Sequence, residues 1–397
     1  MSDILIIGGG FAGVWSALAA ARLRDEHGAG LTITMVTPGD DLVIRPRLYE
    51  ADPAALRVPL ERILHPVGVT RLPGIATAID SDHRSVAVTH GDGRTERLSY
   101  RRLILASGSA LRRPDLPGGE HLFDVDTLAR AVALDSHLRA LPARPEGSGR
   151  FTAVVVGAGF TGLEVSTELV GRLRALAGPA AHEVRVVLVE RAGMLGPELG
   201  PGPHPIISAA VEELGIEVRL DSSVASLDAA HVRLTDGTEI SAHTTVWTAG
   251  MAASALTRHI PGRRDGLDRL RVDRHLRVPE SPEVFAAGDT AAAMADSDHP
   301  TLQSCQYAIP LGRYAGHNAA ADLLGRPSLE FAPQPYVTCL DLGAAGALLT
   351  TGWERSVKLT GGSAKDLKRT IVEKRIYPPL DDVTALLNAG DPERLWT

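Results

Sequence analysis

The chain is poor in cysteine and has no excess of positive charge, and both shortages limit what it can be. Its 397 residues include only two cysteines, Cys305 and Cys339, and no Cys-x-x-Cys pair. Two cysteines cannot build a disulfide framework, and the redox-active dithiol motif of disulfide reductases is excluded. Lys and Arg number 41 against 48 Asp and Glu, which gives a formal net charge of −7. Nucleic-acid-binding proteins usually show a basic excess, so we do not expect this chain to bind nucleic acid.

Long apolar runs are also missing. No stretch approaches the roughly 18–20 apolar residues that a membrane-spanning helix needs. A strand is expected within the first four residues, so no signal peptide is expected before it. The 14 histidines show no spacing typical of a metal site, and no nucleophile motif is present. We therefore expect a cytoplasmic protein without a metal site, and leave open a peripheral contact with the inner face of the membrane.

The first motif present is a glycine-rich turn between a strand and a helix. The apolar run Ile-Leu-Ile-Ile is typical of a buried strand, and an Ala/Leu-rich helix is expected from about Gly13 to Arg24. In the fingerprint Gly8-x-Gly10-x-x-Gly13, the first glycine permits a tight turn and the second lets a pyrophosphate approach the backbone. The third lets the helix pack close to the strand. Because a second strand at residues 31–36 completes a β-α-β unit, we predict a dinucleotide site here.

The same plan recurs about 150 residues later. Gly157-x-Gly159-x-x-Gly162 follows an apolar strand and opens a helix, and a further strand at residues 183–190 completes the unit. Two copies at this separation indicate two related nucleotide-binding domains rather than one domain with a stray motif. We interpret them as one site for a tightly held flavin dinucleotide and one for an exchangeable nicotinamide dinucleotide.

The two copies differ at the end of their second strand, where an acid is expected to hold the ribose hydroxyls. The second copy has Glu190, whose carboxylate would accept from the ribose of NADH and repel the 2′-phosphate of NADPH. We therefore predict NADH rather than NADPH, although the adjacent Arg191 weakens that preference. The first copy has Thr37, an uncharged hydroxyl that would hold a ribose less strongly. Asp40 or Asp41, just beyond it, is the alternative ribose ligand, although we interpret both as turn residues.

Nearly the whole chain resembles the flavoproteins that carry two dinucleotide-binding domains. The resemblance rests on five segments in order: the first glycine loop (8–13), "LILASGS" (103–109), "GAGFTGLE" (157–164), "VWTAG" (246–250) and "FAAGD" (285–289). Within that group the chain is most similar to the type II NADH:quinone oxidoreductases and their soluble relatives. The phrases specific to that branch are "IRPRLYEAD" (44–52), "VWTAGM" and "VFAAGDTAAAMAD" (284–296).

This resemblance implies roles for residues on both sides of the reaction. Asp289 would bond the ribityl chain of FAD, which is compatible with its also capping a helix, and Gly288 would let the flavin approach. Glu164 would face the junction of nicotinamide and flavin, unless it is only a solvated helix residue. The residues that the resemblance assigns to the flavin site are Gly8, Gly10, Gly13, Thr37, Arg45, Gly108, Gly288, Asp289 and Cys305; those assigned to the NADH site are Gly157, Gly159, Gly162, Glu190 and Gly250.

The match is weaker on the side of the electron acceptor. Membrane quinone reductases of this kind carry an Ala-Gln-x-Ala-x-Gln pattern beside the flavin, and this chain has "CQYAIPLG". Gln306 is retained as a catalytic candidate, while Cys305 and Pro310 replace an alanine and the second glutamine. The proline also removes a backbone donor, which puts a standard respiratory quinone in doubt. A redox pair of Cys305 with Cys339, as in sulfide:quinone oxidoreductases, is an alternative to a small buried thiol.

The expected fold is α/β, with two Rossmann-like domains and a small C-terminal α+β segment. The FAD domain (1–112 and 252–325) is interrupted by the NAD(P)H domain (113–251), and residues 326–397 form the C-terminal part. The basic stretch 364–375 is expected to be a solvated helix packed on the domain, with contact to acidic lipid as the alternative. The resemblance also implies a homodimer.

The function predicted from these features is hydride transfer from NADH to FAD, followed by reduction of a small quinone-like acceptor. Three alternatives stay open: a reductase for a protein electron carrier, a flavin-dependent oxygenase or tailoring enzyme, and an NADH-sensing flavoprotein without turnover.

Overall fold

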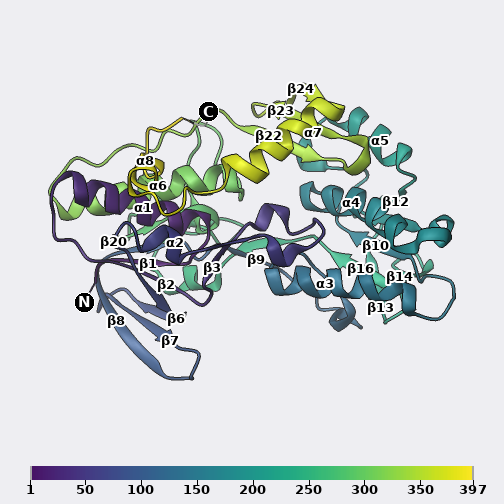
Figure 1. Ribbon diagram of the computed structural model, residues 1–397, viewed down its shortest axis with the longest axis horizontal. Helices are drawn as coiled ribbons and strands as arrows, with labels where there is room; N and C mark the ends of the chain where they lie inside the picture. Colours follow the sequence, from purple (N-terminus) through teal and green to yellow (C-terminus); the bar gives the residue numbers. More distant parts are fainter. Residues whose placement is uncertain (1, 396–397) are drawn as a thin grey trace.

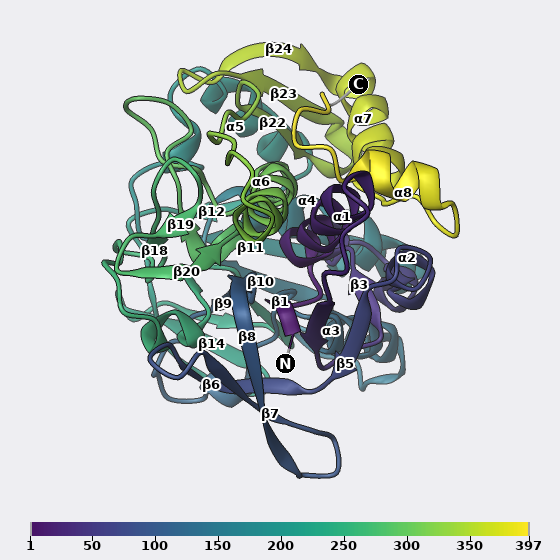
Figure 2. The same cartoon turned by 90° about the vertical axis from the view of Figure 1, so that its left-hand side faces the viewer.

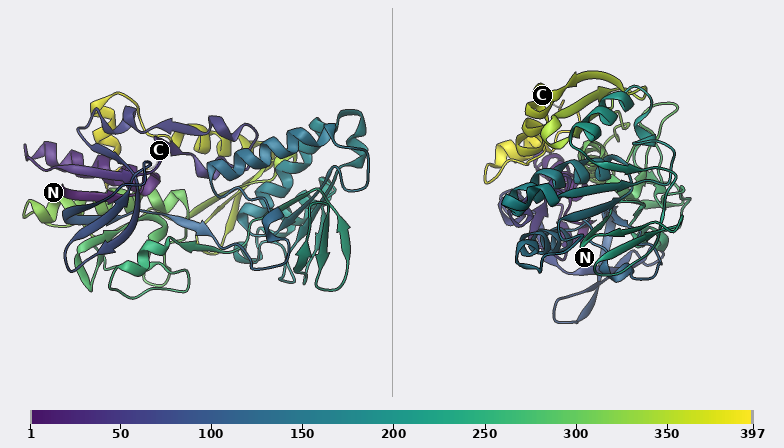
Figure 3. Two further views of the ribbon diagram at one scale, coloured as in Figure 1. Left: turned by 90° about the horizontal axis from the view of Figure 1, so that it is seen from below. Right: turned by 90° about the vertical axis from the view of Figure 1, so that its right-hand side faces the viewer.

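The first of two α/β lobes is built on a sheet with strand order β19-β20-β8-β1-β2-β5. The structure is a computed structural model that describes residues 2–395, and the lobes lie side by side in Figures 1 and 3. The central strand pairs in parallel with both neighbours, and Ile6 lies opposite Met35 and Ile104. The strands are β1 (Ser2–Ile7), β2 (Ile33–Thr37), β5 (Thr70–Pro73), β8 (Thr95–Leu105), β19 (Arg277–Val278) and β20 (Ser281–Ala286).

Two helices, α1 (Phe11–Glu26) and α6 (Cys305–Leu323), lie together beside this sheet, as Figure 2 shows. Their backbones approach closely because α6 presents glycines to α1. A Cβ on Gly312 would lie 2.4 Å from the carbonyl oxygen of Ala12, and one on Gly316 would lie 2.1 Å from that of Ser16. Two elements from late in the chain therefore complete the first lobe: β20 extends its sheet beside β8, and α6 packs against α1.

The second lobe has a four-stranded parallel sheet of order β12-β11-β10-β16. All five residues of β10 are buried, as expected for a strand covered on both faces. Its elements are α3 (Leu128–Ala140), β10 (Thr152–Val156), α4 (Phe160–Ala177), β11 (Arg185–Val189), α5 (His204–Glu213), β12 (Glu217–Arg219) and β16 (Thr244–Trp247). An antiparallel sheet of β13 (Val224–Leu227), β14 (His231–Leu234) and β15 (Glu239–Ser241) completes the lobe.

The chain passes between the lobes at two adjacent strands. β9 (Ser109–Leu111) leads out of the first lobe and β17 (Met251–Ala253) leads back, and the two pair antiparallel with Ala110 opposite Ala252. The remaining short elements are β3 (Asp41–Val43), β4 (Arg57–Pro59), α2 (Glu61–Leu64), β6 (Ile75–Asp80), β7 (Ser85–Thr89), β18 (Leu270–Arg271) and β21 (Ala291–Ala292).

The C-terminal part packs against both lobes. Leu340 and Leu348 of its sheet join the hydrophobic core of the second lobe, whereas Val372, Ile376 and Leu386 join that of the first. In Figure 1 this yellow segment crosses from one lobe to the other. Its elements are β22 (Val337–Asp341), β23 (Ala347–Thr351), β24 (Ser356–Thr360), α7 (Gly361–Thr370), a π-helical turn (Ile371–Arg375) and α8 (Val383–Ala389).

The expected fold class, two Rossmann-like α/β units with parallel sheets, is confirmed. Several local expectations are corrected. Of the segment 103–109, residues 103–105 are the end of the longer strand β8, and the basic helix expected at 364–375 changes to π-helical geometry after Thr370. That helix is not wholly solvated, since Lys368 is buried. Within residues 2–395, no helix has the length and apolarity to span a bilayer.

Candidate functional site

A cavity of about 1820 Å³ lies where the lobes and the C-terminal part meet. It is larger than the roughly 300–1,000 Å³ typical of a site for one drug-sized ligand. Its wall includes the first glycine loop, the first turn of α4 and the start of α6. The carboxyl ends of parallel strands and the helix N-termini after them therefore converge on one space, as is usual for ligand sites in doubly wound folds.

The first glycine loop has the geometry that a dinucleotide needs. Gly8 has φ +115°, and a Cβ on Gly13 would lie 1.9 Å from the carbonyl oxygen of Gly8. A Cβ on Gly10 would meet no other atom within 4 Å in the part of the chain that the structure describes, so the start of α1 is open there. The backbone donors of this helix end are therefore accessible to a phosphate from the cavity side.

Other residues expected in the flavin site lie around the same loop. Thr37 ends β2, lines the cavity and is 7% exposed. Gly108 has φ +70° and open space where a Cβ would stand. The hydroxyl of Ser107, beside it, is buried and lacks a hydrogen-bond partner among the described residues. An orphaned buried hydroxyl and the open loop both fit a bound polar ligand such as FAD.

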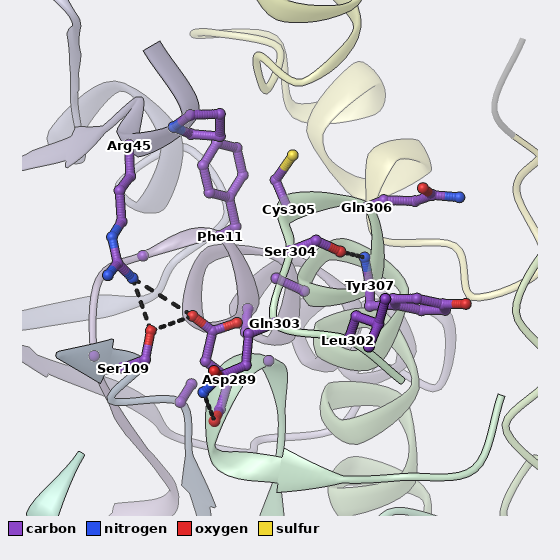
Figure 4. A pocket seen from close by; sticks show the side chains of 18 of the residues that line it. Phe11, Arg45, Ser109, Asp289, Leu302, Gln303, Ser304, Cys305, Gln306 and Tyr307 are labelled. Atoms are coloured by element: carbon purple, nitrogen blue, oxygen red, sulfur yellow. Dashed lines mark hydrogen bonds and ion pairs between the residues drawn. The ribbon is translucent and has the colours of Figure 1, made fainter. Parts of the chain in front are cut away.

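Asp289 belongs to a polar network at the far side of this site, shown in Figure 4. Its carboxylate accepts a hydrogen bond from the Ser109 hydroxyl at 2.6 Å and lies 3.5 Å from Nη1 of Arg45. Arg45 also forms an ion pair with Asp126, and Gly288 has φ +66°. The expected ribityl ligand and the expected Arg45 are thus in direct contact, although they are 244 positions apart in the sequence.

The second glycine loop repeats the geometry of the first. Gly157 has φ +101°, and a Cβ on Gly162 would lie 1.7 Å from the carbonyl oxygen of Gly157. Glu190, the predicted ribose ligand, is 8% exposed, and its two oxygens accept from the amides of Ala158 at 2.7 Å and Ala192 at 2.9 Å. It therefore braces the loop, and its bond to a ribose stays a prediction. Gly250, with φ +85°, lies beside Arg112, next to the strands β9 and β17 that connect the two lobes.

Glu164 is part of a buried ion pair and is not a solvated helix residue. Its Oε1 lies 2.7 Å from Nζ of Lys368 and accepts from the amide of Asp341 at 3.1 Å. Both side chains are at most 7% exposed, and both line the cavity. Burial raises the pKa of Glu164, and the Lys368 ammonium opposes that rise. Burial acts to lower the pKa of Lys368, but attraction to Glu164 outweighs it, and this pKa is raised.

Lys368 could not be selected from the sequence alone. It lies on a helix whose other charged residues are half-buried (Lys365) or exposed (Asp366 and Arg369), and its partner is 204 positions away. Lys368 also donates to the carbonyl of Cys339 at 2.9 Å, which fixes the start of the C-terminal sheet against α4. Asp341, whose amide bonds to Glu164, also forms an ion pair, since Nζ of Lys365 lies 2.5 Å from its carboxylate.

The acceptor-side residues lie at the N-terminus of α6. The amide of Gln306 faces the backbone of Val337, whose N–H lies 3.4 Å from Oε1 of Gln306, so this side chain bonds to the C-terminal sheet. Cys305 and Cys339 are both free thiols. Burial raises the pKa of each to about 11, so both stay protonated near neutral pH. Pro310 lies inside α6 and lines the cavity.

Residues 2–312 match the pyridine nucleotide-disulphide oxidoreductases. The chain belongs to this family. An NADH dehydrogenase-like protein of Mycobacterium tuberculosis is 46% identical over 400 residues, covering 99% of this chain and 98% of that protein. A demethylphylloquinone reductase of Synechocystis is 28% identical over 394 residues, covering 97% and 95%. Family membership confirms the resemblance drawn from the motifs.

Solved structures of the family share the fold. An NDH2 structure from Plasmodium falciparum with NADH superposes with a TM-score of 0.76 at 13% identity, covering 98% of this chain and 97% of that one. A sulfide:quinone oxidoreductase of Aquifex aeolicus gives a TM-score of 0.77 at 17% identity, covering 99% and 93%. By its family and its sequence relatives, the chain is an enzyme of the flavin-dependent pyridine nucleotide oxidoreductase class.

Proposed function

We propose that this enzyme oxidises NADH through bound FAD and passes the electrons to a quinone-like small molecule. The observation that carries the proposal is the meeting of two glycine-loop helix termini at a single cavity. The first loop, with its open helix end, suits a permanently held FAD, and the second suits NADH. FAD, when bound, supplies a ring that accepts a hydride and releases electrons one or two at a time.

The part of the cavity wall formed by Glu164 and Lys368 suits an acceptor that takes up protons when it is reduced. Reduction of a quinone needs two electrons and two protons, so ionisable groups that reach the cavity are required. The Glu164–Lys368 pair lines the cavity and is shielded from bulk water. In this proposal Glu164 and Lys368 hold the exchangeable protons, and Gln306 positions the acceptor from the start of α6.

The class of acceptor is proposed from relatives and from two departures. Relatives that match most of this chain include a demethylphylloquinone reductase and a type II NADH:quinone oxidoreductase from Staphylococcus haemolyticus. Cys305 and Pro310 depart from the pattern of membrane quinone reductases, which favours a dedicated quinone over a standard respiratory one. NADH over NADPH, a cytoplasmic or membrane-peripheral location and a homodimer are part of the same proposal.

The test is an anaerobic titration of the purified yellow protein with NADH, followed by the visible absorption of the flavin. One equivalent of NADH is expected to bleach the flavin, with NADPH less effective. Bleaching by NADPH alone would overturn the role of Glu190, and no bleaching by either would overturn the reductase function. The reduced enzyme is then mixed with quinones, ferredoxin or oxygen. Fast reoxidation by ferredoxin or oxygen, or by none of the three, would support the carrier-reductase, oxygenase or sensor alternative respectively.

A further inference from the structure

The carboxylate of Glu198 lies on the N-terminus of α4. Its Oε1 accepts a hydrogen bond from the amide of Phe160 at 2.9 Å. The same oxygen is 2.8 Å from the point where a Cβ on Gly159 would stand. Gly159 is the second glycine of the loop, the position that lets a dinucleotide phosphate approach the backbone. The Glu198 side chain therefore occupies space that the phosphates of a dinucleotide would need.

The first glycine loop provides an internal comparison. Gly10 holds the equivalent position there, and a Cβ on it would meet no atom within 4 Å. At the start of α4, in contrast, the carboxylate of Glu198 accepts a hydrogen bond from the amide of Phe160. The loop assigned to a permanently bound cofactor is thus open, and the loop assigned to an exchangeable one is filled by an anionic side chain.

The segment that carries Glu198 is anchored, while the side chain itself is exposed. Pro197–Leu199 form a 3-10 turn between Gly196 and Gly200, which have φ +54° and +74°. The Leu199 side chain is 4% exposed in the core of the second lobe, and the amide of Gly196 donates to the carbonyl of Ala158 at 2.9 Å. Glu198 can therefore leave the helix end by rotating its side chain, without unfolding of the segment.

A buried cation lies against the same segment. Arg355, 6% exposed, stacks its guanidinium 4.5 Å above the Tyr336 ring and lines the cavity together with Glu198. Its Cγ is 3.9 Å from the point where a Cβ on Gly200 would stand. Its Nη1 is buried and has no hydrogen-bond partner among the described residues. A guanidinium in this position suits a nearby phosphate or carboxylate.

We propose that Glu198 is a built-in competitor of the NADH diphosphate, filling its position on α4 before the dinucleotide binds and leaving when it does. The inference rests on the proposed function, since it takes the second loop as the NADH site. When the oxidised dinucleotide departs, the amides at the helix end lose their partner, and the carboxylate replaces it. Glu198 thereby weakens dinucleotide binding and favours exchange.

The test measures binding of ADP-ribose, which carries the diphosphate but cannot reduce a flavin. Isothermal titration calorimetry is performed on the flavin-loaded enzyme and on the variant Glu198→Gln, which removes the charge and keeps the size. The Kd for ADP-ribose is expected to fall about two- to fivefold, the effect of one charge at a helix terminus. Glu213→Gln is the matched control, because this exposed glutamate of α5 lies in the same lobe and makes the same change in net charge.

Three results would overturn the inference: an unchanged Kd, weaker binding by Glu198→Gln, or equal tightening by Glu213→Gln. Weaker binding would mean that Glu198 is a ligand of the dinucleotide. If NADH bleaches the wild-type flavin but Glu198→Gln binds ADP-ribose like the wild type, only this inference fails. If the wild type neither binds ADP-ribose nor is bleached by NADH, the proposed function fails and the inference with it.

Discussion

At the scale of residues, the main feature is the buried ion pair of Glu164 and Lys368 in the cavity wall. Glu164 and Lys368 come from different parts of the chain, and each is the counter-charge that makes burial of the other tolerable. A buried ion pair adds little net stability, but removing one partner leaves an uncompensated charge. The pair is therefore expected to act as a unit in which neither residue can be replaced alone.

Substitution Lys368→Met tests this dependence. It is expected to lower the free energy of unfolding by about 3 kcal/mol at pH 8, because Glu164 then lies buried without its cation. Glu164 has a raised pKa, and without Lys368 that pKa rises further. When a carboxyl has a higher pKa in the folded than in the unfolded protein, the free energy of unfolding falls as the pH rises above the pKa in the unfolded chain. The deficit of the variant should therefore be much smaller at pH 5 than at pH 8.

Urea denaturation of the wild type and the variant at both pH values measures the deficit. The double variant Glu164→Gln/Lys368→Met is the control, and its deficit is expected to be smaller and independent of pH. A deficit for Lys368→Met that is equal at pH 5 and pH 8 would show that lost packing, and not charge, is responsible.

At the scale of elements, the glycine-loop fingerprint predicted the strand–turn–helix units because the turn needs those glycines wherever it occurs. Both loops have the expected positive φ at their first glycine, and α1 and α4 begin close to where the sequence placed them. The contact of α6 with α1 was not predicted, since it depends on glycines whose partners lie about 300 positions away. Helix α8 was not predicted either, because it is only seven residues long.

Substitution Gly316→Ala tests the crossing of α1 and α6. The added methyl group would lie 2.1 Å from the carbonyl oxygen of Ser16, so the helices must move apart. We expect a loss of about 2 kcal/mol in the free energy of unfolding, as for overpacking in a core. Gly171→Ala is the matched control, because Gly171 is an exposed position inside α4 with no atom within 4 Å of an added Cβ.

This control should raise the free energy of unfolding by up to about 1 kcal/mol, the difference in helix propensity. Thermal or urea unfolding followed by circular dichroism measures both variants. If Gly316→Ala were as stable as Gly171→Ala, the close helix crossing would be wrong.

For the whole molecule, the feature that the sequence could not show is the division of the C-terminal part between two cores. Its residues contact both lobes, and the cavity takes its walls from all three parts. Composition and periodicity describe neighbours along the chain, whereas this arrangement depends on contacts between distant segments. We therefore expect the three parts to unfold together, although the chain has two lobes.

Tryptophan reporters can test this cooperativity. Trp15 lies in the first lobe, Trp247 in the second and Trp353 in the C-terminal part, and Trp396 is outside the described residues. Variants that keep one of the three, with the other tryptophans changed to Phe, should give fluorescence transitions that coincide with release of flavin. All midpoints should rise together when FAD is added. Separate midpoints for Trp15 and Trp247 would mean that the lobes unfold independently.

The two halves of the first lobe are synthesised at different times. Its strand β8 ends at Leu105, but β20 and the helix α6 that covers α1 come from about 200 residues later. At a ribosomal rate of about 5–20 residues per second, the first half waits roughly 10–40 seconds for its second half. The intervening lobe is synthesised within that interval, but its core still lacks Leu340 and Leu348 of the C-terminal part. The nascent chain thus carries an uncovered apolar helix face for most of its elongation, which makes it a natural client for a ribosome-associated chaperone.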